Sequence, residues 1–350
     1  MPRIGDLVRR GGRRVGAHRG EAAVVAGFML AVAGVSDLSG LSPWLVRGFG
    51  AAGLTGGLLV AFATVWLPIA VIDFRRCTRE TSLRSRVEAD LACHAAEAEG
   101  RRRHRAELTS RCEAVLDGGG PTIVYQPIVE VSAGAVVGYE ALSRFADGVA
   151  PDRWFAQAAE VGLGVEMELA AVRRALAGLS GLPGSPYLSV NASPEALCDP
   201  RLPELIAAGC PSRVVVELTE HVPLGNYERY RQAIGTLREM GSRVAVDDAG
   251  AGYSSLRHVV DLQPDMIKID RSLVHAVHLE PARRSLLIAF VSFASDLGAT
   301  LVAEGVEEPL EEEVLRQWGL RFAQGWLYGR PMPLEVLSAA RGTRPLYVSA

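Results

Sequence analysis

The feature that most constrains the fold is an alternation of short β-forming runs with amphipathic stretches of helical length between residues 121 and 347. Strands separated by helices in this way pair in parallel, with the helices covering the sheet. About 225 residues of such units suit a closed eight-stranded barrel. We therefore predict an α/β protein with a (β/α)8 TIM-like barrel over residues 118–347. The expected strands lie at 123–124, 136–139, 187–190, 214–216, 243–246, 266–269, 300–303 and 321–323, and the expected helices at 153–179, 227–240, 282–297 and 310–318.

Polar side chains stand at the carboxyl ends of most of these expected strands. In a parallel barrel such ends meet at one mouth, where active sites lie. One acid after a strand is commonly a helix cap, but a series of acids, an amide, a lysine and a glutamine predicts a shared site. The residues concerned are Glu140, Asn191, Glu217, Asp247, Asp248, Lys268, Glu304 and Gln324.

Acids gathered at one mouth would repel one another strongly in a partly dry pocket. Lys268, the only lysine of the chain, supplies one positive charge, which is not enough to neutralise these carboxylates. A bound metal is therefore expected, and oxygen ligands without Cys or His select hard ions such as Mg²⁺ or Mn²⁺. The adjacent pair Asp247 and Asp248 suits two ions about 3.5–4 Å apart, an arrangement used for attack on a phosphate.

A series of motifs, in order along residues 121–345, resembles the EAL-domain phosphodiesterases, which hydrolyse the bacterial second messenger cyclic di-GMP to linear pGpG. The resemblance implies in-line attack of metal-activated water on phosphorus. The motifs are Tyr125-Gln-Pro-Ile128, Glu140-Ala-Leu-Ser-Arg144, Val190-Asn191, Glu217-Leu-Thr-Glu220, Asp247-Asp248, Lys268-Ile-Asp270, Glu304-Gly-Val-Glu307 and Gln324-Gly325.

The resemblance also implies a role for each matched residue. The expected metal ligands are Glu140, Asn191, Glu217, Asp247 and Asp248, holding two Mg²⁺ or Mn²⁺ ions. The expected catalytic residues are Glu304, Lys268 and Gln324, and the expected substrate-binding residues are Gln126, Leu142 and Arg144. Glu220 would anchor the loop after Asp248, and the barrel would form a homodimer.

Two other functions are compatible with acids at strand ends. A barrel of the same family could bind cyclic di-GMP as a sensor without cutting it. An enolase-like barrel also places acids and a lysine there to stabilise an enediolate, but it has no use for the guanidinium of Arg144. The loop Asp248-Ala249-Gly-Ala251-Gly departs from the Asp-Phe-Gly-Thr-Gly usual in the resembled family, which predicts weaker coupling between subunits.

The first 117 residues predict a membrane anchor and a connector. Residues 1–20 are rich in arginine, and residues 21–72 are expected to contain two spans, one near 22–35 and one in the charge-free run 48–72. Arginines at both outer ends predict an inner-membrane protein with its barrel in the cytoplasm. A signal peptide followed by one span, or a buried helical hairpin, are the alternatives for the first run. Residues 73–117 read as a linker helix.

Composition limits the partners and metal sites that we expect for this chain. The formal net charge is −3, which gives no global signature for binding a nucleic acid duplex. The five cysteines form no Cys-x-x-Cys pair and no zinc-ligand spacing. Cyclic di-GMP and a membrane are therefore the expected partners.

Overall fold

The computed structural model describes residues 51–218, 227–250 and 253–339. The chain divides into two compact units, Met1–Glu99 and Gly100–Ala350. The expected first span near 22–35 and the basic segment 1–20 lie outside the described residues, as do Glu220 and Ala251.

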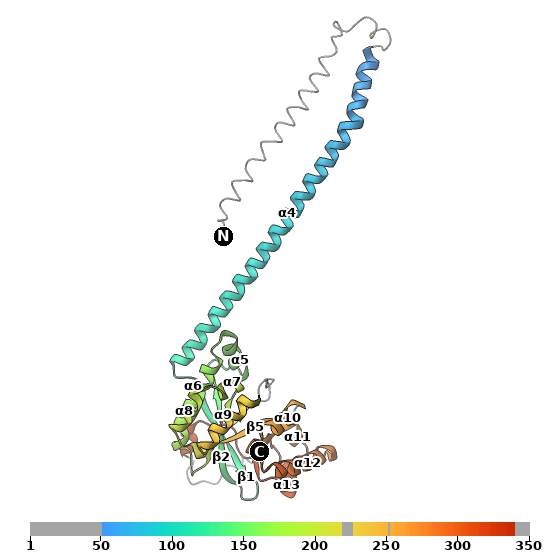
Figure 1. The fold of residues 1–350 in the computed structure, drawn as a ribbon. Helices are drawn as coiled ribbons and strands as arrows, with labels where there is room; N and C mark the ends of the chain where they lie inside the picture. The colour runs from blue at the N-terminus through green and yellow to red at the C-terminus, as the bar shows by residue number, and fades with distance from the viewer. Residues whose placement is uncertain (1–50, 219–226, 251–252, 340–350) are drawn as a thin grey trace. The chain divides into compact units, whose positions relative to one another are not determined.

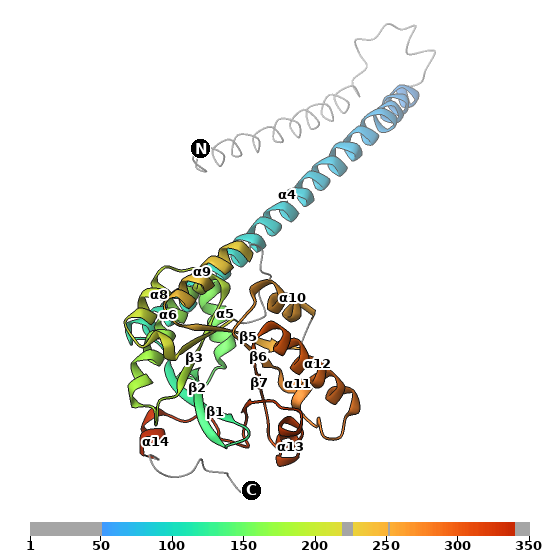
Figure 2. The same ribbon diagram turned by 60° about the horizontal axis from the view of Figure 1, so that its bottom comes forward.

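The second unit is a closed barrel of eight strands in sequence order. Figures 1 and 2 show these strands at the centre of the unit, with α6, α8 and α9 on one side and α10 to α13 on the other. Every expected strand is present. The strands are β1 Thr122–Glu130, β2 Ala135–Arg144, β3 Tyr187–Ala192, β4 Val214–Leu218, β5 Arg243–Ala249, β6 Met266–Ile269, β7 Thr300–Ala303 and β8 Phe322–Gln324.

The expectation of an all-parallel barrel is wrong at β1. This strand pairs antiparallel with both β2 and β8, while the pairs from β2 to β8 are parallel. The reason is the connection: only residues 131–134 separate β1 from β2, and a parallel crossover needs a dozen or more residues. The hairpin also extends β2 beyond Glu140, which therefore lies inside its strand and faces Gln126 across the ladder.

The helices follow the predicted pattern with one break. The stretch 153–179 is two helices, because Gly162 adopts a left-handed φ of 84° and ends the first of them. The helices are α4 Ala51–Asp117, α5 Pro151–Val161, α6 Gly164–Gly178, α7 Pro194–Leu197, α8 Arg201–Ala207, α9 Tyr227–Glu239, α10 Tyr253–Leu262, α11 Arg271–Val274, α12 Pro281–Leu297, α13 Pro309–Gln317 and α14 Leu334–Ala339.

Two apolar layers build the barrel. Alternate strand residues point outward and pack under the helices, as Val214, Val216 and Ile267 do. The other set points inward and forms a separate cluster inside the barrel, made of Ile128, Tyr187, Val215, Ala245, Met266, Val302 and Phe322. The interior is therefore a packed core, as expected for a small closed barrel.

Helix α4 ends at Asp117, where Gly119 and Gly120 take φ of 86° and 101° in the turn that leads to β1. Its last turns belong to the second unit. There Cys112 is buried with Phe145 and Trp154, whose rings stack 4.6 Å apart. The last turns of α4 are thus packed on the segment that follows β2.

Within the described residues, none of the helices is both long and apolar enough to cross a membrane. The expected span at 48–72 is not supported there. On the linker part of α4, the apolar side chains of Leu83, Val87 and Leu91, four residues apart, are exposed.

Candidate active site

The functional side chains form the layer directly above the apolar cluster inside the barrel, which we call the plug. Most of them lie two residues from a plug residue on the same strand, and the period of a strand is two, so both point into the barrel. Val215 precedes Glu217 in this way, and Met266 precedes Lys268. In β1, which runs the other way, Gln126 comes two residues before the plug residue Ile128 and still reaches the same layer.

Lys268 lies at the centre of this layer and is 2% exposed. Its Nζ atom lies 2.6 Å from Glu304 Oε1 and 2.8 Å from Glu217 Oε2. It also lies 3.2 Å from Asp247 Oδ1 and 3.4 Å from Glu140 Oε2. Burial alone would lower the lysine pKa, but the four carboxylates outweigh it and hold the pKa well above its usual value. The ammonium is therefore the fixed counter-ion of the site.

Glu217 is the least exposed of the acids around Lys268, at 1% exposure. One carboxylate oxygen accepts a hydrogen bond from Ser189 Oγ and the other contacts Lys268. Burial raises the pKa of Glu217 to about 8, because the nearby Lys268 only partly offsets it. This acid consequently holds a proton near neutral pH until a further cation arrives.

Glu140 has the opposite environment. Its Oε1 accepts a hydrogen bond from Asn191 Nδ2 at 3.2 Å, and its Oε2 accepts one from Gln324 Nε2 at 2.6 Å. Burial would raise the pKa of Glu140, but Lys268 and these amide donors outweigh it and lower the pKa. Gln126 extends the network, because its Oε1 accepts from Gln324 Nε2 and its Nε2 donates to the Gly329 carbonyl.

Asp247, Asp248 and Glu304 bring three carboxylates to the open side of the site, with ligand atoms within 4.8 Å of one another. Asp248 has a φ of 55°, a conformation uncommon for a residue with a side chain. The Asp248 N–H donates to Asp247 Oδ1 at 3.0 Å. Burial, with Asp247 and Glu140 nearby, raises the pKa of Glu304 well above its usual value despite Lys268.

A cavity of about 270 Å³ opens above this layer. Its wall contains most of the predicted catalytic and substrate residues together with an apolar part at Leu142 and Trp326. The predicted residues in the wall are Gln126, Glu140, Leu142, Asp247, Lys268, Glu304 and Gln324. Polar groups that converge on a concave, partly apolar site mark a ligand pocket.

The donors present fit hard divalent cations. Glu140, Asn191, Glu217, Asp247, Asp248 and Glu304 offer carboxylate or amide oxygens, which Mg²⁺ and Mn²⁺ prefer. One ammonium balances four buried or half-buried acids, and two of those acids have raised pKa values. Burial is the largest cause of both shifts, and a divalent ion bound to these carboxylates would favour their ionised form.

Arg144 is not among the residues of the cavity wall. It is exposed, and its guanidinium donates to the adjacent Ser143 carbonyl at 2.7 Å. Three other predicted residues lie beside the wall and contact residues of it: Asn191 contacts Glu140, Glu217 contacts Lys268, and Asp248 contacts Asp247. The structure thus brings the predicted metal-binding and catalytic residues together, and it leaves Arg144, a predicted substrate-binding residue, outside the cavity wall.

The sequence prediction missed some residues of the site. Ser189 and Trp326 were not predicted, and neither was the rim ion pair in which Arg271 lies 2.9 Å from Glu307. Glu168 of α6 is also new, since its Oε2 accepts the Ser193 N–H at 2.7 Å and so holds the chain just after Asn191. The period-two rule could have found Ser189, which lies two residues after Tyr187 and two before Asn191.

A family profile described as EAL domain matches residues 112–331, more than half of the chain. The chain is 32% identical over 238 residues to Escherichia coli PdeB, named a probable cyclic di-GMP phosphodiesterase, which covers 64% of this chain and 45% of the relative. It is 34% identical over 254 residues to Pseudomonas aeruginosa RocR, named a cyclic di-GMP phosphodiesterase, which covers 65% of this chain and 62% of the relative. The chain thus covers less than two thirds of the length of either relative.

The fold is also similar to a solved structure of Klebsiella pneumoniae BlrP1, described as a manganese and cyclic di-GMP complex. The TM-score is 0.55 and the identity 35%, over 61% of this chain and 56% of the other. Another structure of BlrP1 is described as a calcium and cyclic di-GMP complex.

Proposed function

The chain belongs to the EAL domain family, and on that premise we propose that its barrel hydrolyses cyclic di-GMP to pGpG with Mg²⁺ or Mn²⁺. The observation that carries the proposal is the layer of four carboxylates around Lys268 at the floor of the cavity. PdeB and RocR, whose names give this activity, and the BlrP1 complexes with metal and cyclic di-GMP, support it.

When bound, the ions supply charge neutralisation and an activated water for attack on a phosphate. Glu140, Asn191, Glu217 and Asp247 would hold one ion, and Asp247 with Asp248 would hold the second. This protein's contribution is to fix these groups before substrate arrives, because Ser189, Gln324 and the backbone of Asp248 each hold a carboxylate in place. Preorganised charges of this kind need no rearrangement at the transition state.

Other residues of the cavity suit the remaining parts of a cyclic dinucleotide. Lys268 keeps a positive charge next to Glu304, where negative charge would develop on an attacked phosphate. Gln324 lies beside Gln126 at the wall and offers a polar contact to substrate or water. Leu142 and the half-exposed indole of Trp326 provide an apolar surface for a planar base.

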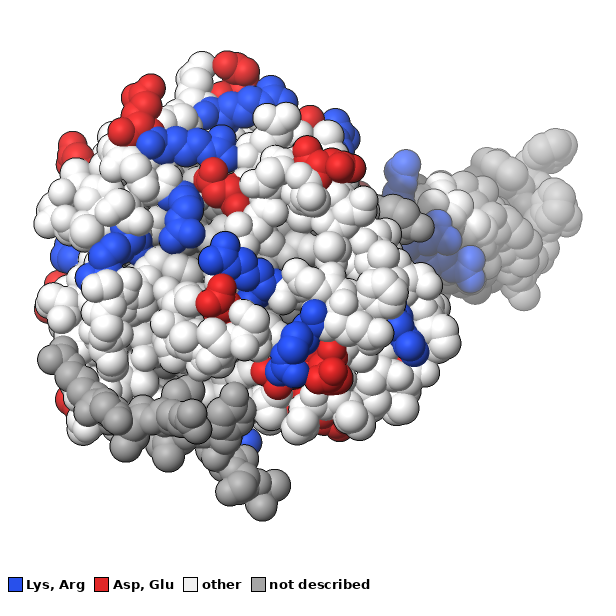
Figure 3. All heavy atoms as spheres, turned by 90° about the horizontal axis from the view of Figure 1, so that it is seen from below, with Lys and Arg blue, Asp and Glu red and all other residues white. Residues whose placement is uncertain are grey.

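One face of the molecule offers no basic surface of the kind that a nucleic acid duplex needs. On the face in Figure 3, arginines and acids alternate over the surface, with no continuous basic strip that would follow a phosphate backbone. A small anionic ligand that enters a single cavity fits this surface better.

The test is incubation of the purified full chain with cyclic di-GMP and Mn²⁺, followed by chromatographic detection of pGpG. We expect turnover by the wild type, and its loss in Glu140→Ala and Lys268→Ala. Glu313→Ala is the matched control, because this glutamate is 67% exposed on α13 and pairs only with surface Arg316 among the described ion pairs. Absence of pGpG from well-folded wild type at saturating Mn²⁺ contradicts the proposed activity.

The alternative of a sensor is favoured by one observation, the position of Arg144 outside the cavity wall. A barrel that lacks this contact would bind the ligand and turn it over weakly. The same incubation separates the two functions, since a sensor leaves all cyclic di-GMP intact after complete binding.

Membrane attachment and dimerisation rest on the sequence. We propose that residues 21–72 anchor the chain in the inner membrane with the barrel in the cytoplasm, supported by the charge-free run 48–72 and the arginines around it. Recovery of the full chain in the carbonate-washed membrane fraction would support this location, and recovery in the soluble fraction would contradict it. Light scattering on the purified protein tests the proposed homodimer.

A further inference from the structure

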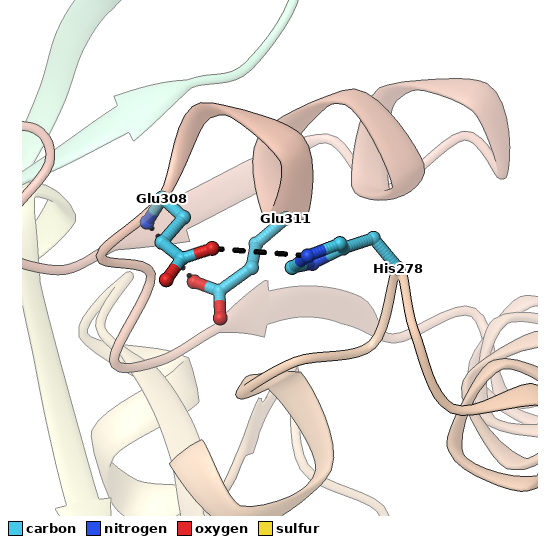
Figure 4. Close-up of side chains that lie close together, drawn as sticks. All are labelled: His278, Glu308 and Glu311. Atoms are coloured by element: carbon cyan, nitrogen blue, oxygen red, sulfur yellow. Dashed lines mark hydrogen bonds and ion pairs between the residues drawn. The ribbon is translucent and has the colours of Figure 1, made fainter.

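A second group of metal-ligand side chains lies outside the site described above. His278 lies in the turn between α11 and α12, and Glu308 and Glu311 stand at the first turn of α13. Figure 4 shows the three side chains directed toward one another. Their ligand atoms lie within 4.8 Å of one another, and His278 Nε2 is 3.8 Å from Glu308 Oε2.

Glu311 is the fixed member of this group and is fully buried. Its Oε1 accepts the Ala276 N–H at 2.8 Å, and its Oε2 accepts the N–H groups of Glu307 at 2.9 Å and Glu308 at 3.1 Å. These bonds hold the carboxylate rigidly between the turn and the start of α13. Its described ion-pair partner is His275, at 3.5 Å, rather than an arginine or lysine.

Hydrogen bonding to the start of α13 explains why the Glu311 carboxylate is buried, but it does not explain why the His278 ring lies beside it. The ring of His278 is 14% exposed, and its Nδ1 atom is buried without a hydrogen-bond partner among the described residues. A buried polar atom of this kind calls for an unseen water or ion. The nitrogen that lies 3.8 Å from Glu308 is the other one, Nε2. Glu308 is 55% exposed, and its side chain accepts the backbone N–H of Glu311 in the capping box that begins α13.

We infer that His278, Glu308 and Glu311 form a separate binding site for a borderline divalent cation of the zinc type. Zinc binds imidazole nitrogen and carboxylate oxygen at about 2.0–2.2 Å, and a site with three protein ligands keeps a water in the fourth position. Closing the site needs the Glu308 carboxylate to turn from the helix cap toward the ring, while the Glu311 carboxylate is already held beside it. The site at the barrel mouth has only oxygen donors and selects harder ions such as Mg²⁺ or Mn²⁺. The two sites would therefore bind different metals.

The position of the group gives the ion a structural consequence. Glu311 holds the backbone of Glu307 and Glu308, just after Glu304 and within the loop that forms part of the cavity wall. An ion shared by His278 and Glu311 would tie the turn before α12 to this loop. Occupancy should therefore stabilise the folded protein by mass action.

The experiment is calorimetric titration of the untagged full chain with Zn²⁺ in excess Mg²⁺, which keeps the mouth site filled. We expect one saturable Zn²⁺ site, and binding weaker by at least about tenfold in His278→Gln and in Glu308→Gln. His94→Gln is the matched control, because His94 is an exposed helical histidine 3.7 Å from Glu97. It should bind as the wild type does.

Two further measurements fix the place of the ion. Zn²⁺ should bind Asp247→Asn, which alters the mouth, as tightly as it binds the wild type, and should raise the thermal denaturation midpoint of both. Co²⁺ bound in place of Zn²⁺ should show an absorption spectrum of mixed nitrogen and oxygen ligands that His278→Gln changes. Equal Zn²⁺ affinity of the wild type and the two site variants, or loss of binding in Asp247→Asn alone, overturns the inference.

Discussion

Lys268 Nζ lies 2.8 Å from Glu217 Oε2, and both side chains are 2% exposed, so this pair forms the floor of the cavity. A buried charge is tolerated only when it is paired and hydrogen-bonded. The same lysine also contacts Glu140, Asp247 and Glu304, and its ammonium therefore holds the acidic residues of the site together.

Replacement of Lys268 by Met should destabilise the ion-free protein. Removing one partner of a buried charge group costs about 3–5 kcal/mol, because the remaining carboxylates are left without a counter-ion. Saturating Mn²⁺ should restore part of that loss, since it supplies positive charge to the same acids. Urea unfolding with chelator and with Mn²⁺ measures both effects, and an equal loss in the two conditions would argue against metal binding among these acids.

The ion-free protein should lose stability as the pH rises from 6 to 8. Burial raises the pKa of Glu217 from 4.5 to about 8 in the folded state, so in this window the folded protein binds more protons than the unfolded chain. The contribution is complete below pH 4.5 and is lost as the pH rises through about 8. The raised pKa of Glu304 acts in the same direction.

Unfolding free energies from urea titrations at pH 6, 7 and 8 in chelator test this dependence. Saturating Mg²⁺ should flatten the curve, because the ion replaces the protons on the same carboxylates. Glu217→Gln in chelator should flatten it as well. A stability that increases with pH over this range in chelator would show that Glu217 does not hold a proton in the fold.

Trp326→Leu should weaken substrate binding with little effect on the chemical step. The indole is 50% exposed, lines the cavity and has the Arg330 guanidinium 4.1 Å from its ring centre. Stacking of a base on an aromatic side chain contributes about 1–3 kcal/mol, which predicts a rise in KM of about fivefold or more.

Steady-state kinetics and quenching of tryptophan fluorescence by cyclic di-GMP in Ca²⁺ separate binding from turnover. Trp318→Leu is the matched control, because this tryptophan is 38% exposed at the end of α13 and is not part of the cavity wall. If both variants keep the wild-type KM, the indole of Trp326 does not contact the substrate.

Ala249→Phe should destabilise the barrel. From the sequence, Ala249 and Ala251 are interpreted as shortened side chains that weaken coupling between subunits. In the structure, Ala249 is fully buried in β5 and pairs with Ile269 of β6. Overpacking of a filled core commonly costs about 1–3 kcal/mol. Thermal unfolding should show this loss, whereas Ala282→Phe at an exposed position of α12 should leave the midpoint near that of the wild type. An Ala249→Phe variant as stable as the wild type would reveal space at this position.

The sequence alone was sufficient for the strand order and for most of the site. Val215 with Glu217, and Met266 with Lys268, show why: in a strand of period two, an inward apolar residue and the polar residue two positions on must share a face. Parallel strands then bring such faces to one mouth. The EAL motifs point to the same residues, so local pattern and tertiary packing agree here.

Only the tertiary structure decided the antiparallel direction of β1, the hydrogen bond from Ser189 to Glu217, and the exposure of Arg144. Which way a strand runs depends on the length of its connection, and which side chains touch depends on barrel closure. Proton affinity shows the same limit: Glu140 and Glu217 are identical residues with pKa values moved in opposite directions. Burial and hydrogen-bond partners set those values, and both arise from residues far apart in the chain.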